Sequence, residues 1–345
     1  MDRMAVKART RLSRATLAAL LGSTCAAAVP ASSLATDFAS PLAKATAPTY
    51  TLVTEPSQGL ASIYNLISSA KKTIDITMYE LSDTTVTRLL AAQAADGVTV
   101  RVILDQNLEK SNNTTAYSYL SSHGVTVHWA DTKYQATHQK TITVDGTTSA
   151  IMTLNLTPQY YSTSRDFAVI ENDANDVAAI EAAFAKDLTN STVTPGTGDD
   201  LVWSPTTSLA SLETIIVNAR YTLQVENEEM ADTSIVDALE AAAKRGVNVE
   251  VIMTYSSSYA SEFSRLEKAG VHVVTYAETA PLYIHAKIVL ADYDKTGANA
   301  FVGSENFSYP SLTENRELGL ITTNAAIMSS LNTTLTSDYT GGNAY

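Results

Sequence analysis

The segment SAKKTIDITMYELSDTTV, residues 69–86, reappears as NARYTLQVENEEMADTSI at residues 218–235 without a gap. Further along, RLLAAQAADGVTVRVIL (88–104) corresponds to DALEAAAKRGVNVEVIM (237–253), and shorter matches continue towards the end of each copy. A correspondence of this length indicates two copies of one structural unit. The chain therefore consists of two similar halves.

Each copy alternates strand-like apolar runs with helical ones. The order is helix, strand, helix, strand, helix, strand and then a hairpin, and an alanine-rich helix follows at about 176–188 and 324–335. This alternation predicts an α/β fold in which each half has a mostly parallel sheet flanked by helices. We expect the two homologous halves to pack with pseudo-twofold symmetry around a shared site, as the subunits of a homodimer would.

The domain boundaries follow from composition. Residues 1–35 begin with basic residues and continue with the apolar run ATLAALLGSTCAAAVPA, which is typical of an export signal peptide, the alternative being an N-terminal membrane anchor. After this signal we expect a flexible lead-in at 36–50, half 1 at 51–188, a polar linker at 189–200 and half 2 at 201–345. The protein is therefore expected to be secreted or periplasmic.

Charge and cysteine content narrow the possible functions. Cleavage after residue 35 removes five of the 23 basic residues and one of the 36 acidic ones, which leaves a formal charge of −17. That charge argues against broad nucleic-acid binding, which needs a basic surface. The single cysteine, Cys25, lies in the expected signal, so the mature chain has no disulfide and no cysteine metal site.

Both halves carry the same string of reactive residues, histidine-x-lysine followed after four residues by aspartate. The two strings are His138, Lys140, Asp145 and His285, Lys287, Asp292. At the start of a strand, residues two apart point to the same side, so each histidine would share a face with its lysine. Burying such a pair is costly unless an anion lies between them, which indicates a bound anionic group.

Further polar residues follow each string at matching positions. They are Thr153, Asn155 and Asp166 in half 1, and Ser304, Asn306 and Glu317 in half 2. Here the chain resembles the phospholipase D superfamily, whose signature is two H-x-K-x4-D motifs, each with a downstream G-S/T-x-N. Half 2 has GSEN, whereas in half 1 Met152 replaces the glycine. The resemblance covers nearly all of the mature chain.

The residue types fit phosphodiester hydrolysis, in which negative charge on the phosphate oxygens has to be stabilised. Lys140 and Lys287 would supply cationic donors. The expected phosphate-binding residues beside them are Asn155, Thr153, Asn306 and Ser304. One histidine would attack phosphorus while the other protonates the leaving oxygen.

The remaining roles concern orientation. Asp166 and Glu317 are expected to hydrogen-bond the histidines and fix their ring orientation. The resemblance implies that His138 is the nucleophile, and that Asp145 and Asp292, which we count with the catalytic motif, support its turns.

No metal or other cofactor is expected, because lysine is not a metal ligand and cysteine is absent from the mature chain. The other histidines are interpreted as structural: His123, His128 and His272. Several tyrosines flank the motifs and could line a head-group pocket by cation–π contact, the alternative for each being surface packing. They are Tyr134, Tyr160, Tyr161, Tyr283 and Tyr309.

The expected function is that of an exported phospholipase D-type hydrolase, which forms phosphatidic acid and an alcohol through a phosphohistidine and can exchange head groups. The expected partner is phospholipid at a membrane surface, because a zwitterionic head group is repelled less by the charge of −17 than nucleic acid is. The alternatives are a metal-independent nuclease of the same superfamily and an inactive phosphate-binding module. Because one chain holds both half-sites, a monomer is expected.

Overall fold

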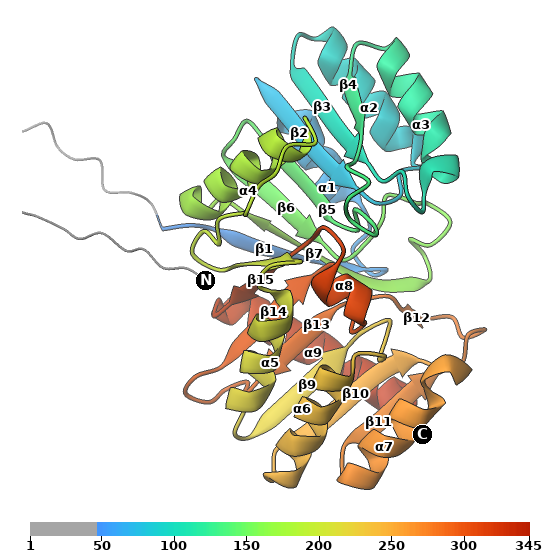
Figure 1. Ribbon diagram of the computed structural model, residues 1–345, viewed down its shortest axis with the longest axis vertical. Helices are drawn as coiled ribbons and strands as arrows, with labels where there is room; N and C mark the ends of the chain where they lie inside the picture. Colours follow the sequence, from blue (N-terminus) through green and yellow to red (C-terminus); the bar gives the residue numbers. More distant parts are fainter. Residues whose placement is uncertain (1–46) are drawn as a thin grey trace, which may run out of the picture. The chain divides into compact units, whose positions relative to one another are not determined.

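The sequence repeat corresponds to two mixed α/β sheets in the computed structural model, which describes residues 47–345 (Figure 1). The expected signal peptide and residues 36–46 of the expected lead-in lie outside the described residues. Half 1 contains β1 (Tyr50–Glu55), α1 (Ala61–Ser69), β2 (Thr73–Met78), α2 (Thr84–Ala95), β3 (Thr99–Leu104), α3 (Lys110–Ser122), β4 (Thr126–Trp129), β5 (Lys140–Val144), β6 (Thr148–Met152), β7 (Ser164–Glu171) and α4 (Ala174–Asp187).

Half 2 repeats this order with small additions. It contains β8 (Leu201–Ser204), α5 (Ser208–Asn218), β9 (Thr222–Glu226), α6 (Thr233–Lys244), β10 (Asn248–Thr254), the 3₁₀ turn η1 (Ser257–Tyr259), α7 (Ala260–Ala269), β11 (His272–Tyr276), β12 (Tyr283–Ile284), β13 (Ile288–Ala291), β14 (Asn299–Gly303), α8 (Tyr309–Thr313), β15 (Glu317–Thr322), α9 (Ala325–Gly341) and β16 (Asn343–Ala344).

The expected α/β fold of two homologous halves is confirmed, and each sheet is mixed rather than mostly parallel. The strand order is β1-β7-β6-β5-β2-β3-β4 in one sheet and β16-β11-β10-β9-β13-β14-β15-β8 in the other. Only β2-β3-β4 and β9-β10-β11 pair in parallel along these paths, while the remaining neighbours are antiparallel. The reason is the length of the connections. A parallel pair of strands needs a connection of a dozen or more residues. The turn between β5 and β6 is short, with Asp145 and Gly146 at positive φ, so these two strands pair antiparallel.

Matching capping residues start the equivalent helices of the two halves. Asp83 accepts backbone hydrogen bonds at the start of α2, and Asp232 does so at the start of α6. Asp173 and Asn324 cap α4 and α9 in the same way. Each such cap contributes about 1 kcal/mol to helix stability. Equivalent helices of the two halves therefore begin at matching positions of the repeat.

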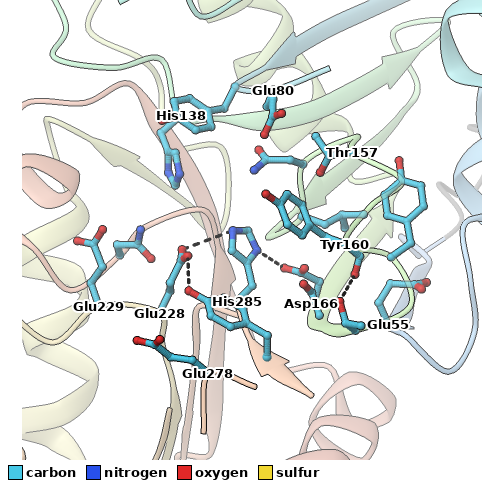
Figure 2. A pocket seen from close by; sticks show the side chains of 18 of the residues that line it. Glu55, Glu80, His138, Thr157, Tyr160, Asp166, Glu228, Glu229, Glu278 and His285 are labelled. Carbon is cyan, nitrogen blue, oxygen red and sulfur yellow. Dashed lines mark hydrogen bonds and ion pairs between the residues drawn. The ribbon is translucent and has the colours of Figure 1, made fainter. Parts of the chain in front are cut away.

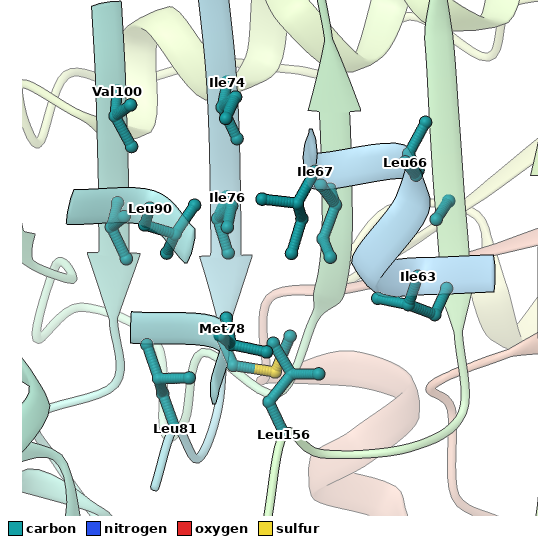
Figure 3. Close-up of a cluster of buried hydrophobic side chains, with 14 of the residues drawn as sticks. Ile63, Leu66, Ile67, Ile74, Ile76, Met78, Leu81, Leu90, Val100 and Leu156 are labelled. Atoms are coloured by element: carbon teal, nitrogen blue, oxygen red, sulfur yellow. The ribbon is translucent and has the colours of Figure 1, made fainter. Parts of the chain in front are cut away.

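Apolar layers hold each sheet between helices. In half 1, Ile74 and Ile76 of β2 pack against Ile63 and Ile67 of α1, with Leu90 of α2 alongside (Figure 3). Helices α5, α6 and α7 cover the corresponding face of the second sheet (Figure 1). The opposite faces of both sheets share a third core with α4 and α9, whose members include Phe167, Trp203, Ile288 and Leu331. This shared core fixes the two halves against each other.

Candidate active site

His138 lies in the connection that leads into β5, and half 2 holds it in place. Its backbone N–H donates to the carbonyl of Arg316 at 2.9 Å. Its Nδ1 lies 2.8 Å from Oε2 of Glu317, a residue of β15. Because an ionised carboxylate only accepts hydrogen bonds, this contact places the proton on Nδ1 and leaves Nε2 of the neutral ring free to act on a ligand.

His285 lies in the connection between β12 and β13, and half 1 holds it in the reciprocal way. Its backbone N–H donates to the carbonyl of Arg165 at 3.2 Å, and β12 pairs with β7. Its Nδ1 lies 2.8 Å from Oδ1 of Asp166. Each imidazole is thus oriented by a carboxylate from the other half. Both histidines precede the regular strands rather than lying within them, because β5 begins at Lys140 and β13 at Ile288.

The hydroxyl residues of the repeat do not reach the place where phosphate was expected. Thr153 is fully buried and donates from Oγ1 to Asp166 at 2.5 Å. Ser304 is also buried, and its Oγ accepts the backbone N–H of Leu318 at 3.1 Å. Both were expected to bind phosphate, but each is buried and hydrogen-bonded to the neighbouring strand that carries the carboxylate. Thr153 therefore orients Asp166, while Ser304 anchors β15 beside Glu317.

The two motif lysines are buried beside their histidines. Lys140 and Lys287 are 1% and 0% exposed, and each Nζ donates to the carbonyl oxygen of the preceding motif histidine. The ammonium of Lys140 also lies 4.9 Å from the ring centre of Tyr79. Burial and then the charge of Lys287 lower the pKa of Lys140 to about 7. Two cations are therefore held close together where an anion would relieve their repulsion.

Burial also shifts the pKa values of His138 and of its partner Glu317. Burial lowers the pKa of His138, and the charge of Lys140 lowers it further, although the Glu317 carboxylate opposes both effects. For Glu317, burial alone would raise the pKa, but His138 and Lys140 outweigh it and lower the pKa. Glu317 accepts two further hydrogen bonds, from Ser311 at 2.6 Å and Asn315 at 2.9 Å. The pair is thus a neutral imidazole on an ionised carboxylate.

Glu228, which the sequence interpretation missed, completes the site. Its Oε2 lies 3.1 Å from Nζ of Lys287 and 3.4 Å from Nε2 of His285. Burial would raise the pKa of Glu228, but the charges of His285 and Lys287 outweigh it and lower the pKa well below the usual range. A sequence signal existed: Glu228 follows β9, the strand that pairs with β13 beside the motif. It also aligns with Tyr79 in the gapless repeat.

A cavity of about 680 Å³ opens between the halves at these residues. Figure 2 shows His138 and His285 directed into it, with Glu228 joined to His285 and Asp166 on the other side of that ring. Asn155 and Asn306 line the same cavity, and the buried Oδ1 atom of each has no hydrogen-bond partner. The expected asparagines therefore lie where a ligand could contact their carboxamides.

The motif aspartates, which were counted with the catalytic motif, lie at the opposite ends of their strands and do not line the cavity. Asp145 accepts hydrogen bonds from the backbone N–H groups of residues 71–73, and Asp292 accepts from those of residues 220–222. Both have positive φ, at 55° and 52°. The side chains tie the hairpin turn to the loop before β2 or β9, as support of the motif turns requires.

The tyrosines divide into two groups. Tyr160, Tyr161 and Tyr283 line the cavity, and so does Tyr79, which was not singled out from the sequence. Tyr134 is buried under the guanidinium of Arg316, and Tyr309 is 61% exposed at the start of α8. Of the five expected tyrosines, only Tyr134 and Tyr309 therefore lie outside the cavity, where they have packing or surface positions.

The other histidines lie in secondary structure away from the cavity. His123 caps α3, His128 belongs to β4 and His272 to β11. Within residues 47–345, no group of three or more histidine, cysteine or acidic side chains is arranged to hold a metal ion. In the same part of the chain, none of the helices combines the length and the apolar character needed to cross a membrane.

Comparison with known proteins gives one family for both halves. Residues 63–188 and residues 212–339 each match the family described as cardiolipin synthase, PLD-like domain. Cardiolipin synthase A of Pseudomonas putida (strain W619) is 26% identical over 323 residues, covering 81% of this chain and 66% of that protein. Cardiolipin synthase A of Pseudomonas syringae pv. syringae (strain B728a) is 24% identical over 336 residues, covering 84% and 68%. The chain thus spans about two thirds of these relatives.

A solved structure shows the same fold over nearly the whole length of both chains. Phosphatidylserine synthase of Haemophilus influenzae Rd KW20 superposes with a TM-score of 0.65 at 12% sequence identity, covering 86% of this chain and 87% of that one. The two-half architecture is therefore shared between proteins whose sequences differ at most positions.

Proposed function

This chain belongs to the family of cardiolipin synthase, PLD-like domains, and from that premise we propose that it is an exported phosphodiesterase acting on phospholipid head groups. One observation carries the proposal. His138 and His285 face a single cavity, and each has its Nδ1 bound to a carboxylate contributed by the other half. Paired imidazoles held in this way can act as nucleophile and as acid on the same phosphorus atom.

The first chemical step uses the two histidines in different protonation states. Nε2 of neutral His138 attacks phosphorus, and the bond from phosphorus to the head-group oxygen breaks. That oxygen takes a proton from Nε2 of charged His285, so the alcohol leaves and a phosphohistidine remains. Lys140 and Lys287 stabilise the charge on the phosphate oxygens, which is commonly the largest single contribution to such catalysis.

The second step reverses the proton transfer. Neutral His285 takes a proton from water, the water oxygen attacks phosphorus, and the bond from phosphorus to His138 breaks to release phosphatidic acid. An alcohol can replace water, in which case the product is a new phosphodiester with an exchanged head group. Hydrolysis and head-group transfer thus proceed from the same intermediate. The names of the relatives, which are synthases, agree with such transfer chemistry.

The test compares lipid and nucleic acid as substrates. Purified mature protein is incubated with phosphatidylcholine vesicles and ethanol, and in parallel with single- and double-stranded DNA. We expect phosphatidic acid and phosphatidylethanol, no cleavage of DNA, and loss of both lipid products in His285→Ala. Cleavage of DNA that His285→Ala abolishes, without any lipid product, would favour the nuclease. Absence of turnover with all substrates would favour the inactive phosphate-binding module.

The same assay tests the expected independence from metal ions. Lys140 and Lys287 supply the positive charge that a metal ion would otherwise supply at the phosphate. We therefore expect the rate of phosphatidylethanol formation to persist in EDTA. Loss of activity in EDTA that a divalent ion restores would contradict this mechanism. A water-soluble phosphodiester serves as the control substrate, since it separates chemistry from effects of ions on lipid packing.

A further inference from the structure

Glu305, the residue between Ser304 and Asn306, is buried against helix α5. Its side chain is 0% exposed. Within residues 47–345 its one hydrogen-bonding side chain is Ser208, whose hydroxyl donates to Oε1 at 3.1 Å, while Oε2 has no hydrogen-bond partner. A single hydroxyl donor does not replace the hydration of a buried anion. The Glu305 side chain is therefore expected to be a neutral carboxylic acid.

Two facing glycines make room for this carboxyl group. Gly303 of β14 pairs with Gly319 of β15. A Cβ atom on Gly303 would collide with Oε2 of Glu305, and one on Gly319 would lie 3.0 Å from the same oxygen, closer than side chains normally pack. The carboxyl group therefore occupies a recess that a side chain at either glycine position would fill.

Apolar side chains occupy the corresponding positions of half 1. The equivalents of Gly303 and Glu305 are Met152 and Leu154, and both belong to the buried core of that half. Half 1 thus packs a methionine where half 2 has an acid in a glycine recess. The polar recess is a feature of half 2, the half whose Glu317 orients the histidine of half 1.

The recess adjoins the carboxylate that orients His138. Gly319 and Glu317 are two residues apart on β15, so they lie on the same face of the sheet. Burial, and after it the charge of Glu317, raise the pKa of Glu305 well above its usual range. Glu317 is equally buried, but His138 and Lys140 outweigh burial and lower its pKa. Of these two buried carboxyl groups, one therefore holds a proton and the other a charge.

Hydrogen bonds also join the turn that contains Glu305 to Glu317. The backbone N–H of Asn306 donates to Oγ of Ser311 at 2.7 Å, and that hydroxyl donates to Oε1 of Glu317 at 2.6 Å. The backbone carbonyl of Glu305 accepts from Nδ2 of Asn227 at 3.3 Å. A shift of Glu305 would thus move both the Asn306 carboxamide in the cavity and the carboxylate that orients the histidine.

We propose that Glu305 is a positioning residue, which holds a proton in its recess, leaves Glu317 as the single negative charge beside His138 and fixes the turn that carries Asn306. The inference rests on the proposed function, because it concerns the same reaction. A second negative charge beside Glu317 would favour the charged form of His138, which cannot attack phosphorus. The neutral acid thus keeps the nucleophile available.

Infrared spectroscopy at neutral pH tests the protonation of Glu305 without turnover. The difference spectrum between the wild type and Glu305→Gln should contain the C=O stretching band of an un-ionised carboxylic acid. The matched control is Asp237→Asn, which removes a carboxylate that is 60% exposed on α6 and should give carboxylate bands alone. Carboxylate bands in place of the acid band for Glu305→Gln would overturn the inference.

NMR titration of the His138 ring gives a second measurement that needs no turnover. The pKa of His138 should be the same in the wild type and in Glu305→Gln, because a neutral amide replaces a neutral acid. If Glu305 were charged, its removal would lower the pKa of His138. A lower pKa of His138 in the variant would therefore contradict the proposal.

Kinetics test the positioning. Glu305→Gln retains an acceptor for the Ser208 hydroxyl and should keep kcat/KM within about threefold of the wild type, whereas Glu305→Leu leaves that buried hydroxyl unpaired and should lower kcat/KM by about tenfold or more. Leucine is the residue that half 1 has at this position. Equal kcat/KM in Glu305→Leu and the wild type overturns the positioning role. If the wild type turns over no phosphodiester, the proposed function fails, and the infrared and NMR measurements still decide whether Glu305 holds a proton.

Discussion

At the scale of single residues, His138 and His285 have the same kind of partner on Nδ1 but different neighbours at Nε2. His138 has Glu317 on one side and the ring of Tyr79 close by. His285 lies between the carboxylates of Asp166 and Glu228. A carboxylate near each ring nitrogen stabilises positive charge on an imidazole. The geometry therefore favours a neutral His138 and a charged His285, which are the states that the nucleophile and the acid require.

The histidine variants should show this division of roles. His138→Ala and His285→Ala should each remove nearly all turnover, because each histidine acts in both steps, and the double variant should be little worse than either. Phosphate from a labelled substrate, trapped by quenching in base, should be found on His138. His272→Ala, on β11, should keep the kinetics of the wild type. A label on His285, or a tenth of native activity in His285→Ala, would contradict the assignment.

The pH dependence of kcat/KM follows from two shifted groups. Because burial lowers the pKa of His138, this ring stays neutral to a lower pH than a free histidine, and the acid limb should lie below about 6.5. Burial and Lys287 lower the pKa of Lys140 to about 7, so its charge is lost above that pH and kcat/KM should fall. Bound phosphate favours the charged lysine, which should move the alkaline limb of kcat to higher pH. A monotonic profile for a soluble phosphodiester would contradict these assignments.

At the scale of secondary structure, a carboxylate at the far end of each motif strand ties two turns together. The turn after β13 and the loop before β9 are joined by Asp292, which accepts hydrogen bonds from three consecutive backbone N–H groups. Its φ of 52° is a conformation that aspartate and asparagine tolerate better than most residues. Asp292 therefore fixes the position of the motif strand from the end opposite to the catalytic histidine.

Substitution of Asp292 should affect stability more than chemistry. Asp292→Ala loses charge-assisted hydrogen bonds and adds backbone strain, so the free energy of unfolding should fall by about 2–4 kcal/mol. Asp292→Asn keeps the tolerated backbone conformation and should lose less. Denaturant titration measures both, and kcat at a temperature where the variants are folded should stay within about an order of magnitude of the wild type. Loss of catalysis without loss of stability would instead place Asp292 in the chemistry.

At the scale of the whole molecule, each half contributes an arginine that forms an ion pair with an aspartate of the other half. Arg165 pairs with Asp338 of α9, and Arg316 pairs with Asp187 of α4. Each arginine precedes the carboxylate that orients the other half's histidine, and its carbonyl accepts that histidine's backbone N–H. This is the self-complementary pattern of a twofold dimer interface, here within one chain. The active site therefore depends on the packing of the halves.

Breaking one of these buried pairs should destabilise the whole molecule. Asp187→Leu leaves the guanidinium of Arg316, which is 1% exposed, without its carboxylate, and the cost should be about 3–5 kcal/mol. The double variant Arg316→Met with Asp187→Leu should recover part of that loss, because no unpaired charge remains buried. Urea unfolding checks both. The control Lys244→Met removes an exposed pair and should change stability by about 1 kcal/mol or less.

The sequence by itself determined the two halves and the identity of the histidines, lysines and orienting carboxylates. These follow from local periodicity and from the repeat, which displays each motif twice. The tertiary structure decided that His138 takes the carboxylate of Glu317, 179 residues away, that the motif aspartates lie far from the cavity, and that Glu228 lies on Lys287. Local pattern fixes the backbone of each element, whereas pairing between side chains depends on how the elements pack, which short-range spacing does not encode.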